Sequence, residues 1–358
     1  MSADASSAPA VDATGVAPDM AGPALLHEHN MARRGSLGSD ANWDARSAKK
    51  GCGITRKQLI ISSIIIGLLL AGGIAGLVTW TVLKRAKSGN RVDVPSNTNL
   101  TIVPSPDLPK SFYGITYTPL NAQYPECGGT LGDVIEDVKV LSQLTTRLRL
   151  YGMDCEQATH TLEAIKQLKV NVKIVVTIWL DENEKTYDRQ YRLFLEMLDN
   201  ELASRGHPKI PVYTTDIGDV FTEELIRGVD SPLANVHPFF AGITASTAAD
   251  WTWKFFEDRI NGPARKQGKT GIISETGWPT RGDAQDQAVP SVESLQRFLD
   301  DFVCQSNAKG LEYYFFEAFD EPWKAAKFIE REGYWGILTK DRKPKVKFPD
   351  CKTKAPSA

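Results

Sequence analysis

The chain has 358 residues, which exceeds one average domain but suits a single barrel of about 250 residues with appended segments. Its 42% hydrophobic residues can build a sizeable core, and 44 acidic residues balance 42 basic ones. This composition excludes collagen-like, fully disordered and miniature disulfide-scaffold proteins, and no excess of positive charge is available to hold nucleic acid.

The amino-terminal part carries no pattern of a folded domain. Residues 1–50 are rich in Ala, Ser, Gly and Asp and show no apolar period, so burial cannot offset the entropy of ordering them. We expect a disordered cytoplasmic tail over residues 1–57.

A long uncharged segment follows at residues 58–83. Its 26 residues are mostly Ile, Leu, Val, Gly and Ala, which is enough to cross a hydrocarbon core of about 30 Å. The flanking basic residues are nearly balanced, but the only Asn-x-Thr sequon, at Asn99, and four of the five cysteines come after the segment. The sequence therefore predicts a single-pass type II plasma-membrane protein that meets the lipid bilayer through residues 58–83, with glycosylation at Asn99.

Residues 84–110 contain prolines and no apolar period, which is typical of an extended extracellular stalk. From residue 111 to 351, short β-rich runs alternate with amphipathic helical stretches, the pattern of a parallel sheet with crossover helices. One such helix carries an apolar stripe of Tyr191, Phe194, Leu195, Leu198 and Leu202. Seven strands are predicted, at residues 112–118, 146–151, 172–180, 210–215, 235–240, 271–275 and 311–319. The alternation favours a (β/α) barrel or an open doubly wound sheet, and residues 352–358 are expected to be a disordered tail.

Several kinds of site are missing from the sequence. No glycine-rich nucleotide motif follows the first strand, and His-Glu-x-x-His, Cys-x-x-Cys and Gly-x-Ser-x-Gly are absent. We therefore expect neither a cofactor nor a metal. The four cysteines after residue 111 allow three pairings, of which the sequence selects none, and we expect at least one bridge.

Carboxylates and aromatic residues carry the chemistry that remains. Glu275 ends the apolar run 271–275 and precedes Thr276-Gly277-Trp278-Pro279, so a buried strand delivers one carboxylate beside an indole. Residues 315–324 place three further acids and Lys324 among aromatic rings. Glycosidic bond cleavage uses paired carboxylates and flat faces for sugar rings, so this pattern favours glycoside chemistry.

At these residues the chain resembles glycoside hydrolase family 17, the β-1,3-glucanases and glucanosyltransferases of the fungal cell wall. The matching motifs are 273–279 around Glu275, 113–119, 147–152, 235–237 and 319–324. The resemblance implies a (β/α)8 TIM barrel and retaining hydrolysis or transfer on β-1,3-glucan. It also implies that Glu275 is the nucleophile and that Tyr117, Arg149, Glu321 and Lys324 line or support the substrate cleft.

Two aromatic positions complete the expected site. Trp278 is the preferred sugar platform, although Trp179, Trp323 and Trp335 are further candidates and any one of them is more often a core residue. His237 is expected to be a hydrogen-bonded residue at a strand end near the cleft.

One part of the family pattern is missing. The family carries its acid/base glutamate in a Gly-Asn-Glu motif at the end of the fourth strand, and this motif occurs nowhere in the chain. Residues 179–181 lead through one helix to residues 209–212, which resemble the fifth strand, so one βα unit is expected to be absent. No acid/base residue is assigned. Either a coding segment that carries this motif is skipped in the given sequence, or the protein is a degenerate relative that binds glucan as a non-catalytic wall sensor; a third alternative is a protein-interaction barrel without sugar affinity.

Overall fold

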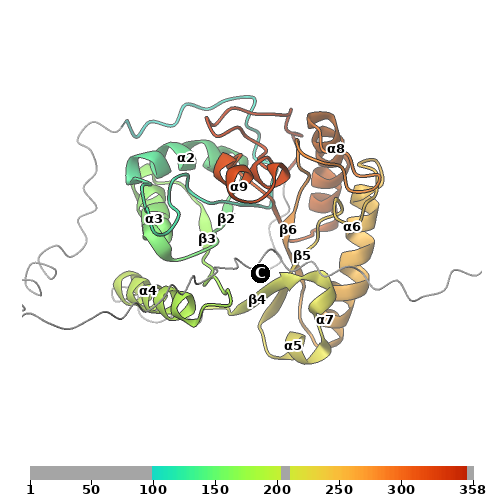
Figure 1. Cartoon of the computed structure of the whole chain (residues 1–358), viewed down its shortest axis with the longest axis horizontal. Helices are drawn as coiled ribbons and strands as arrows, with labels where there is room; N and C mark the ends of the chain where they lie inside the picture. Colours follow the sequence, from blue (N-terminus) through green and yellow to red (C-terminus); the bar gives the residue numbers. More distant parts are fainter. Residues whose placement is uncertain (1–98, 203–209, 353–358) are drawn as a thin grey trace, which may run out of the picture. The chain divides into compact units, whose positions relative to one another are not determined.

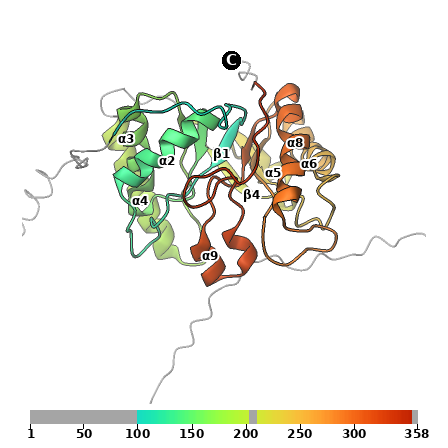
Figure 2. The same cartoon turned by 90° about the horizontal axis from the view of Figure 1, so that it is seen from above.

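The computed structural model describes residues 99–202 and 210–352 (Figures 1 and 2). The predicted cytoplasmic tail, the membrane-spanning segment 58–83 and most of the predicted stalk lie outside these ranges. Within these two ranges, no helix combines the length and apolar character needed to cross a membrane.

In the part of the chain that the structure describes, seven strands form one parallel sheet, and each overlaps a predicted strand, the fifth only at Asn235. They are β1 (Gly114–Thr116), β2 (Arg147–Arg149), β3 (Lys173–Val175), β4 (Tyr213–Ile217), β5 (Ser231–Asn235), β6 (Ile272–Thr276) and β7 (Tyr313–Phe315). Their order in the sheet is β3-β2-β1-β7-β6-β5-β4. The first strand pairs with the last, as in a closed barrel, whereas the consecutive strands β3 and β4 lie at opposite edges and do not pair.

Helices connect the strands and lie outside the sheet, with α2, α3 and α4 beside β1 to β3 and α5 to α8 beside β4 to β7 (Figure 1). Their bounds are α2 (Leu131–Leu144), α3 (Gln157–Leu168), α4 (Glu184–Leu202), α5 (Glu223–Arg227), α6 (Ala248–Phe256), α7 (Gly262–Lys266), α8 (Val292–Lys309) and α9 (Pro322–Lys327). Local signals set several ends: Thr130 begins α2 with a capping box to Asp133, and Gly310, at φ 69°, ends α8.

The core lies between the sheet and this helical layer. Ile115, Leu148, Ile273 and Phe315, from four different strands, are completely buried and belong to one continuous apolar cluster. This core holds the strand ends rigidly, and in parallel α/β sheets those carboxyl ends carry the functional residues.

The fifth predicted strand was misplaced. The sequence analysis set it at residues 235–240, but β5 ends at Asn235 and the chain then turns, with the amide of Phe240 bonded to the carbonyl of His237. The error comes from Pro232, which lacks an amide hydrogen. A proline argues against a central strand, so the sequence favours a strand that begins after it. It is accommodated as the second residue of β5, opposite Thr214 of β4.

The sheet is open between β3 and β4, and we call this opening the β3–β4 seam. Apolar side chains are exposed on both of its flanks. On the α4 side they are Trp179, Leu180, Tyr187, Tyr191 and Leu195, and on the β4 side Ile210, Val212, Tyr213, Ile217 and Val220. The predicted apolar stripe of α4 is thus only partly covered, because Phe194 packs against the core while Tyr191 and Leu195 face solvent. The seam lies where the sequence predicts that one βα unit is absent.

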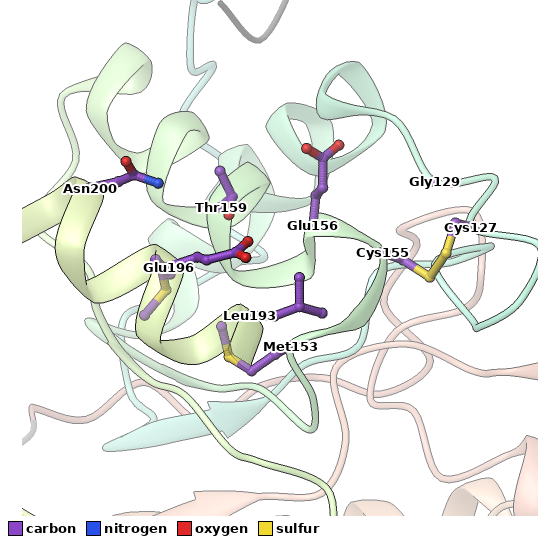
Figure 3. A pocket seen from close by; sticks show the side chains of 10 residues that line it. Cys127, Gly129, Met153, Cys155, Glu156, Thr159, Leu193, Glu196 and Asn200 are labelled. Atoms are coloured by element: carbon purple, nitrogen blue, oxygen red, sulfur yellow. A yellow bond between two sulfur atoms is a disulfide. The ribbon is translucent and has the colours of Figure 1, made fainter. Parts of the chain in front are cut away.

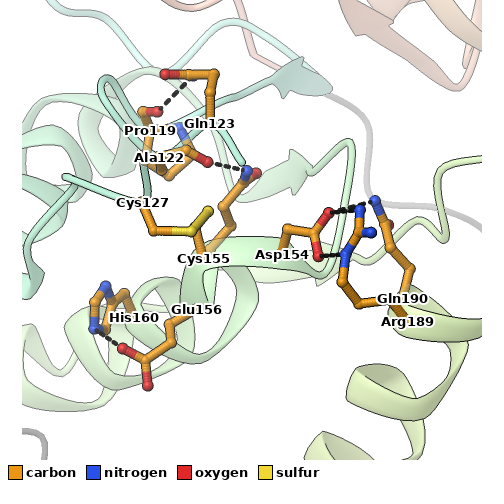
Figure 4. Close-up of a disulfide and its surroundings, with 11 residues drawn as sticks. Pro119, Ala122, Gln123, Cys127, Asp154, Cys155, Glu156, His160, Arg189 and Gln190 are labelled. Atoms are coloured by element: carbon orange, nitrogen blue, oxygen red, sulfur yellow. Dashed lines mark hydrogen bonds and ion pairs between the residues drawn. A yellow bond between two sulfur atoms is a disulfide. The ribbon is translucent and has the colours of Figure 1, made fainter. Parts of the chain in front are cut away.

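Two disulfides join distant parts of the domain, as expected for at least one bridge. Cys127 pairs with Cys155 between the loop after β1 and the start of α3 (Figure 4), and Cys304 of α8 pairs with Cys351. The residues just before Ser111 also contact the domain, since Leu108 packs against the core and the amide of Ser105 donates to Gln143.

Candidate active site

Glu275 lies near the carboxyl end of β6, and both of its carboxylate oxygens are bound. Oε1 accepts a hydrogen bond from Nη1 of Arg149 at 2.7 Å, and Oε2 lies 3.2 Å from Nε2 of His237. The Arg149 side chain comes from β2, across the barrel interior, and His237 follows β5. Glu275 keeps 11% of its side-chain surface exposed, so it is held rigidly and still reaches solvent.

These partners determine the charge of Glu275. Burial raises the pKa of its carboxyl, but the hydrogen bonds and positive charges of His237 and Arg149 outweigh burial and lower the pKa to about 2. Because a carboxylate can only accept, the Nε2–H of His237 is the donor. Glu275 is therefore ionised at any physiological pH, as a carboxylate nucleophile requires.

Aromatic rings fix His237 in this orientation. Its imidazole packs edge-on against Phe240, Phe316 and Trp335, with ring centroids 5.8, 5.3 and 5.1 Å away. Its Nδ1 is buried and has no hydrogen-bond partner in the part of the chain that the structure describes. The expectation that His237 is hydrogen-bonded at a strand end is met, and its partner is the predicted nucleophile.

A polar network supports the same carboxylate from the neighbouring strands. Thr215 Oγ1 lies 2.9 Å from Ser274 Oγ, which donates to Asn235 Oδ1 at 2.7 Å. Nη2 of Arg149 reaches Thr215 at 3.4 Å. The sequence analysis did not select Thr215 or Ser274. Simple alternation does not find Ser274, because a register shift between β5 and β6 brings the consecutive residues Ser274 and Glu275 into the same network.

Close packing of the backbone explains why glycine follows Thr276. A Cβ on Gly277 would lie 2.0 Å from the carbonyl oxygen of Phe316, so only glycine allows the ends of β6 and β7 to approach this closely. The amide of Phe316 also donates to the carbonyl of Thr276 at 2.7 Å. The two strand ends that carry acids are thereby held together.

A second acidic cluster lies just after β7. Glu317 and Glu321 are each 1% exposed, and Nζ of Lys324 lies 3.0 Å from Glu317 and 2.6 Å from Glu321. Burial and the negative charge of Glu321 raise the pKa of Glu317 well above its ordinary value, against the effect of Lys324. The two carboxyl groups thus share one ammonium group, and burial favours the protonated form of Glu317.

Two of the predicted binding residues are corrected by their burial. Trp278 is fully buried, packs against Phe239 and Phe298 and donates its Nε1–H to the carbonyl of Val289, so it has no free face for a sugar. Tyr117 is also fully buried, and its hydroxyl donates to Asp137 at 2.6 Å. Both side chains are packed inside the domain, so in this structure Tyr117 can support the cleft and Trp278 offers no exposed ring face.

The other predicted positions behave differently. Arg149 is 2% exposed and positions Glu275, and the buried Glu321 positions Lys324. Lys324 itself keeps 18% of its side chain exposed. Among the candidate platforms Trp335 is buried, while Trp179, beside the β3–β4 seam, is 48% exposed.

No carboxyl group of the described residues is assigned the role of general acid. Asp216 of β4 is exposed and bonds the amide of Ile217, on the opposite face from Thr215. Asp181, in the loop after β3, bonds the amide of Asn183. Neither carboxylate is tied to the Glu275 cluster by a hydrogen bond in the described ranges.

A cavity of about 370 Å³ lies elsewhere, between α4 and the Cys127–Cys155 bridge (Figure 3). Met153, Leu193 and Met197 supply its apolar wall, and Glu156 and Glu196 its charge. No residue of the Glu275 cluster lines it. Within residues 99–202 and 210–352, no group of three or more His, Cys, Asp or Glu side chains is arranged to hold a metal ion.

Comparison with protein families decides the assignment of the chain. The profile of the BtgE/BtgC glycoside hydrolase domain matches residues 114–201 and 194–336. The chain belongs to this family. The match comes in two pieces that meet on α4, next to the β3–β4 seam.

Individual relatives agree with the family. The chain is 35% identical over 306 residues to a probable glucan endo-1,3-β-glucosidase btgC of Aspergillus flavus, covering 69% of this chain and 45% of the relative. It is 36% identical over 304 residues to the corresponding Aspergillus fumigatus protein, covering 68% and 44%. The chain thus spans less than half the length of these two relatives.

Solved structures show the same fold. A glycoside hydrolase family 17 β-1,3-glucanosyltransferase from Rhizomucor miehei superposes with a TM-score of 0.57 at 26% identity, covering 67% of this chain and 97% of that one. An endo-laminarinase from Formosa, at 16% identity and a TM-score of 0.53, shows the likeness of fold alone. The predicted likeness to the family 17 fold is confirmed in the form of a curled seven-stranded parallel sheet with helices.

Proposed function

We propose that this chain acts as a retaining glycosidase on β-1,3-linked glucosyl donors, with Glu275 as its nucleophile. The observation that carries the proposal is the ionised carboxylate of Glu275, held by Arg149 and His237 at the end of β6. Attack by this carboxylate on the anomeric carbon forms a glycosyl-enzyme, which water or a sugar hydroxyl then resolves. The names of the relatives and a Rhizomucor miehei mutant complex with laminaritriose support β-1,3-glucan as the substrate class.

We also infer that the domain works outside the cell, facing the wall, on a type II anchor at residues 58–83. Two disulfides and an exposed Asn99 support an oxidising, glycosylating compartment.

Covalent trapping tests the catalytic proposal. A 2-fluoro-laminaribiosyl fluoride should add one disaccharide mass to Glu275, located by peptide mass spectrometry, because fluoride departs readily and the fluorine slows release of the sugar. Glu275→Gln should abolish the label, and the exposed Glu293→Gln of α8 should retain it. Labelling of another residue would contradict the assignment of the nucleophile.

A second function is favoured by a specific observation. The missing Gly-Asn-Glu motif and the open sheet suit a non-catalytic glucan-binding sensor of the wall. Calorimetric binding of laminaritetraose without any covalent label would favour this reading.

A further inference from the structure

Resting on the proposed function, we propose that this chain transfers β-1,3-linked glucosyl units only from donors whose leaving group departs without a proton. Such donors are aryl glycosides of acidic phenols, glycosyl fluorides and glycosyl esters. The choice of donor depends on two parts of the site: the nucleophile, and the general acid that would protonate a leaving group.

The groups that nucleophilic attack requires are all in place around Glu275. Glu275 is ionised, both its oxygens are positioned by charged or polar partners, and the aromatic packing of His237 fixes one of those partners. The backbone beneath it is fixed by the close approach of Gly277 to Phe316. No further group is needed to attack an anomeric carbon that bears a good leaving group.

The groups around Glu275 that hold protons cannot deliver them to a departing oxygen. The Nε2–H of His237 and the Nη1–H of Arg149 are bound to Glu275 itself. Burial and the charge of Glu275 raise the pKa of Tyr151 well above its ordinary value, so its phenol keeps its proton. Burial raises the pKa of Glu317, but its side chain is 1% exposed and accepts a hydrogen bond from Lys324 of α9.

The place of a general acid is open as well. In a retaining glycosidase the two carboxyl groups stand about 5 Å apart on either side of the scissile bond. The family resemblance puts the acid on the fourth strand, which would lie between β3 and β4. Those two strands are the free edges of this sheet in the described ranges, and the nearby carboxylates of Asp216 and Asp181 accept hydrogen bonds from the local backbone amides of Ile217 and Asn183.

The reaction balances without an acid for such donors. Glu275 forms a bond to C1 while the C1–O bond to the aryl group breaks, and the aryloxide leaves with the electron pair. In the second step a nucleophile forms a bond to C1 and returns the ester electron pair to Glu275. Water needs a base to take its proton, whereas an anion such as azide does not, so azide should speed this step and yield the β-glycosyl azide.

Steady-state and burst kinetics of the full-length chain test the inference. The donors are dinitrophenyl β-laminaribioside, phenyl β-laminaribioside and laminaritriose, each with and without sodium azide. We expect a burst of dinitrophenolate, faster turnover with azide, and turnover of laminaritriose that is lower by about 100-fold to 10,000-fold, the usual contribution of a general acid. Glu275→Gln should remove the burst and Glu293→Gln should keep it, with circular dichroism verifying that both variants fold.

The alternative outcomes separate this inference from the proposed function. Similar rates on all three donors with no response to azide would show that an acid is present, overturning the inference while leaving Glu275 as nucleophile. In that case loss of laminaritriose turnover in Glu317→Gln would identify Glu317 as the donor. No burst and no label on Glu275 with any donor would overturn both proposals.

Discussion

The guanidinium of Arg149 and the carboxylate of Glu275 meet at 2.7 Å although 126 residues separate them in the chain. Their side chains are 3% and 11% exposed, so the pair is largely removed from water. A buried pair of this kind gives little net stability when intact, but removing one partner leaves an unpaired charge in the interior.

Replacing Arg149 by Met should therefore cost stability. We expect the free energy of unfolding to fall by about 3–5 kcal/mol, measured by urea denaturation at neutral pH. The control is Arg297→Met, which breaks an exposed pair with Asp301 on α8 and should cost no more than about 1 kcal/mol. Equal losses in the two variants would mean that the Arg149 pair is not buried as described.

His237 should control the pH dependence of the nucleophile. Replacing it by Phe removes the donor to Oε2, so the pKa of Glu275 should rise from about 2 and the acid limb of the labelling rate should move to higher pH. Gln at the same position keeps an amide donor and should shift the limb less. His160→Gln is the matched control, because His160 pairs with Glu156 outside the cluster, and its profile should equal that of the parent.

The lowered pKa of Glu275 also links its charge to folding. Its contribution to stability is complete above the ordinary pKa of 4.5 and is lost as pH falls toward about 2, where the folded protein also binds the proton. The lost contribution is about 3 kcal/mol at about 1.4 kcal/mol per pKa unit. The difference in unfolding free energy between parent and Glu275→Gln should shrink by this order across that range.

The disulfides should stabilise the domain to similar extents. Loop-closure entropy predicts losses of about 3.5 kcal/mol for the 28-residue separation of Cys127–Cys155 and about 4 kcal/mol for the 47-residue separation of Cys304–Cys351. Paired Cys→Ser variants measured by thermal unfolding check these values. Dithiothreitol should lower the Tm of the parent, and a variant lacking both bridges should not respond to it.

The free edge of β4 should promote self-association. Val212 is 64% exposed just before β4, which pairs with β5 on one side only, and a lysine on such an edge opposes strand pairing between molecules. Val212→Lys should lower concentration-dependent association in sedimentation velocity without changing the Tm. Val289→Lys, at a 55% exposed position in the loop before α8, should leave association unchanged.

Much of the site could be read from the sequence because its signals are local. Glu275 ends one apolar run, and the acids at residues 317–321 follow another. Because strands and helices alternate along the chain, the strands are parallel and both groups come to the same end of the sheet. The absent βα unit was also predicted, from a missing motif and a count of seven strands, and the free edges of β3 and β4 agree with it.

Other features depend on packing that no local pattern encodes. Trp278 looks like a sugar platform because it follows the nucleophile, but the rings of Phe239 and Phe298, from elsewhere in the chain, enclose it. The contact of His237 with Glu275 likewise depends on β5 ending at Asn235, two residues before His237. Pro232 obscures this strand in the sequence, because proline is rare in central strands.

An unclosed sheet also has a mechanical consequence. In a full cylinder, strand number, tilt and stagger together determine the radius. Here the sheet does not close between β3 and β4, so strand pairing does not fix the separation of Val175 from Tyr213 at its two edges. A polysaccharide that contacted both edge strands at once would bridge them, and its binding would stiffen the domain.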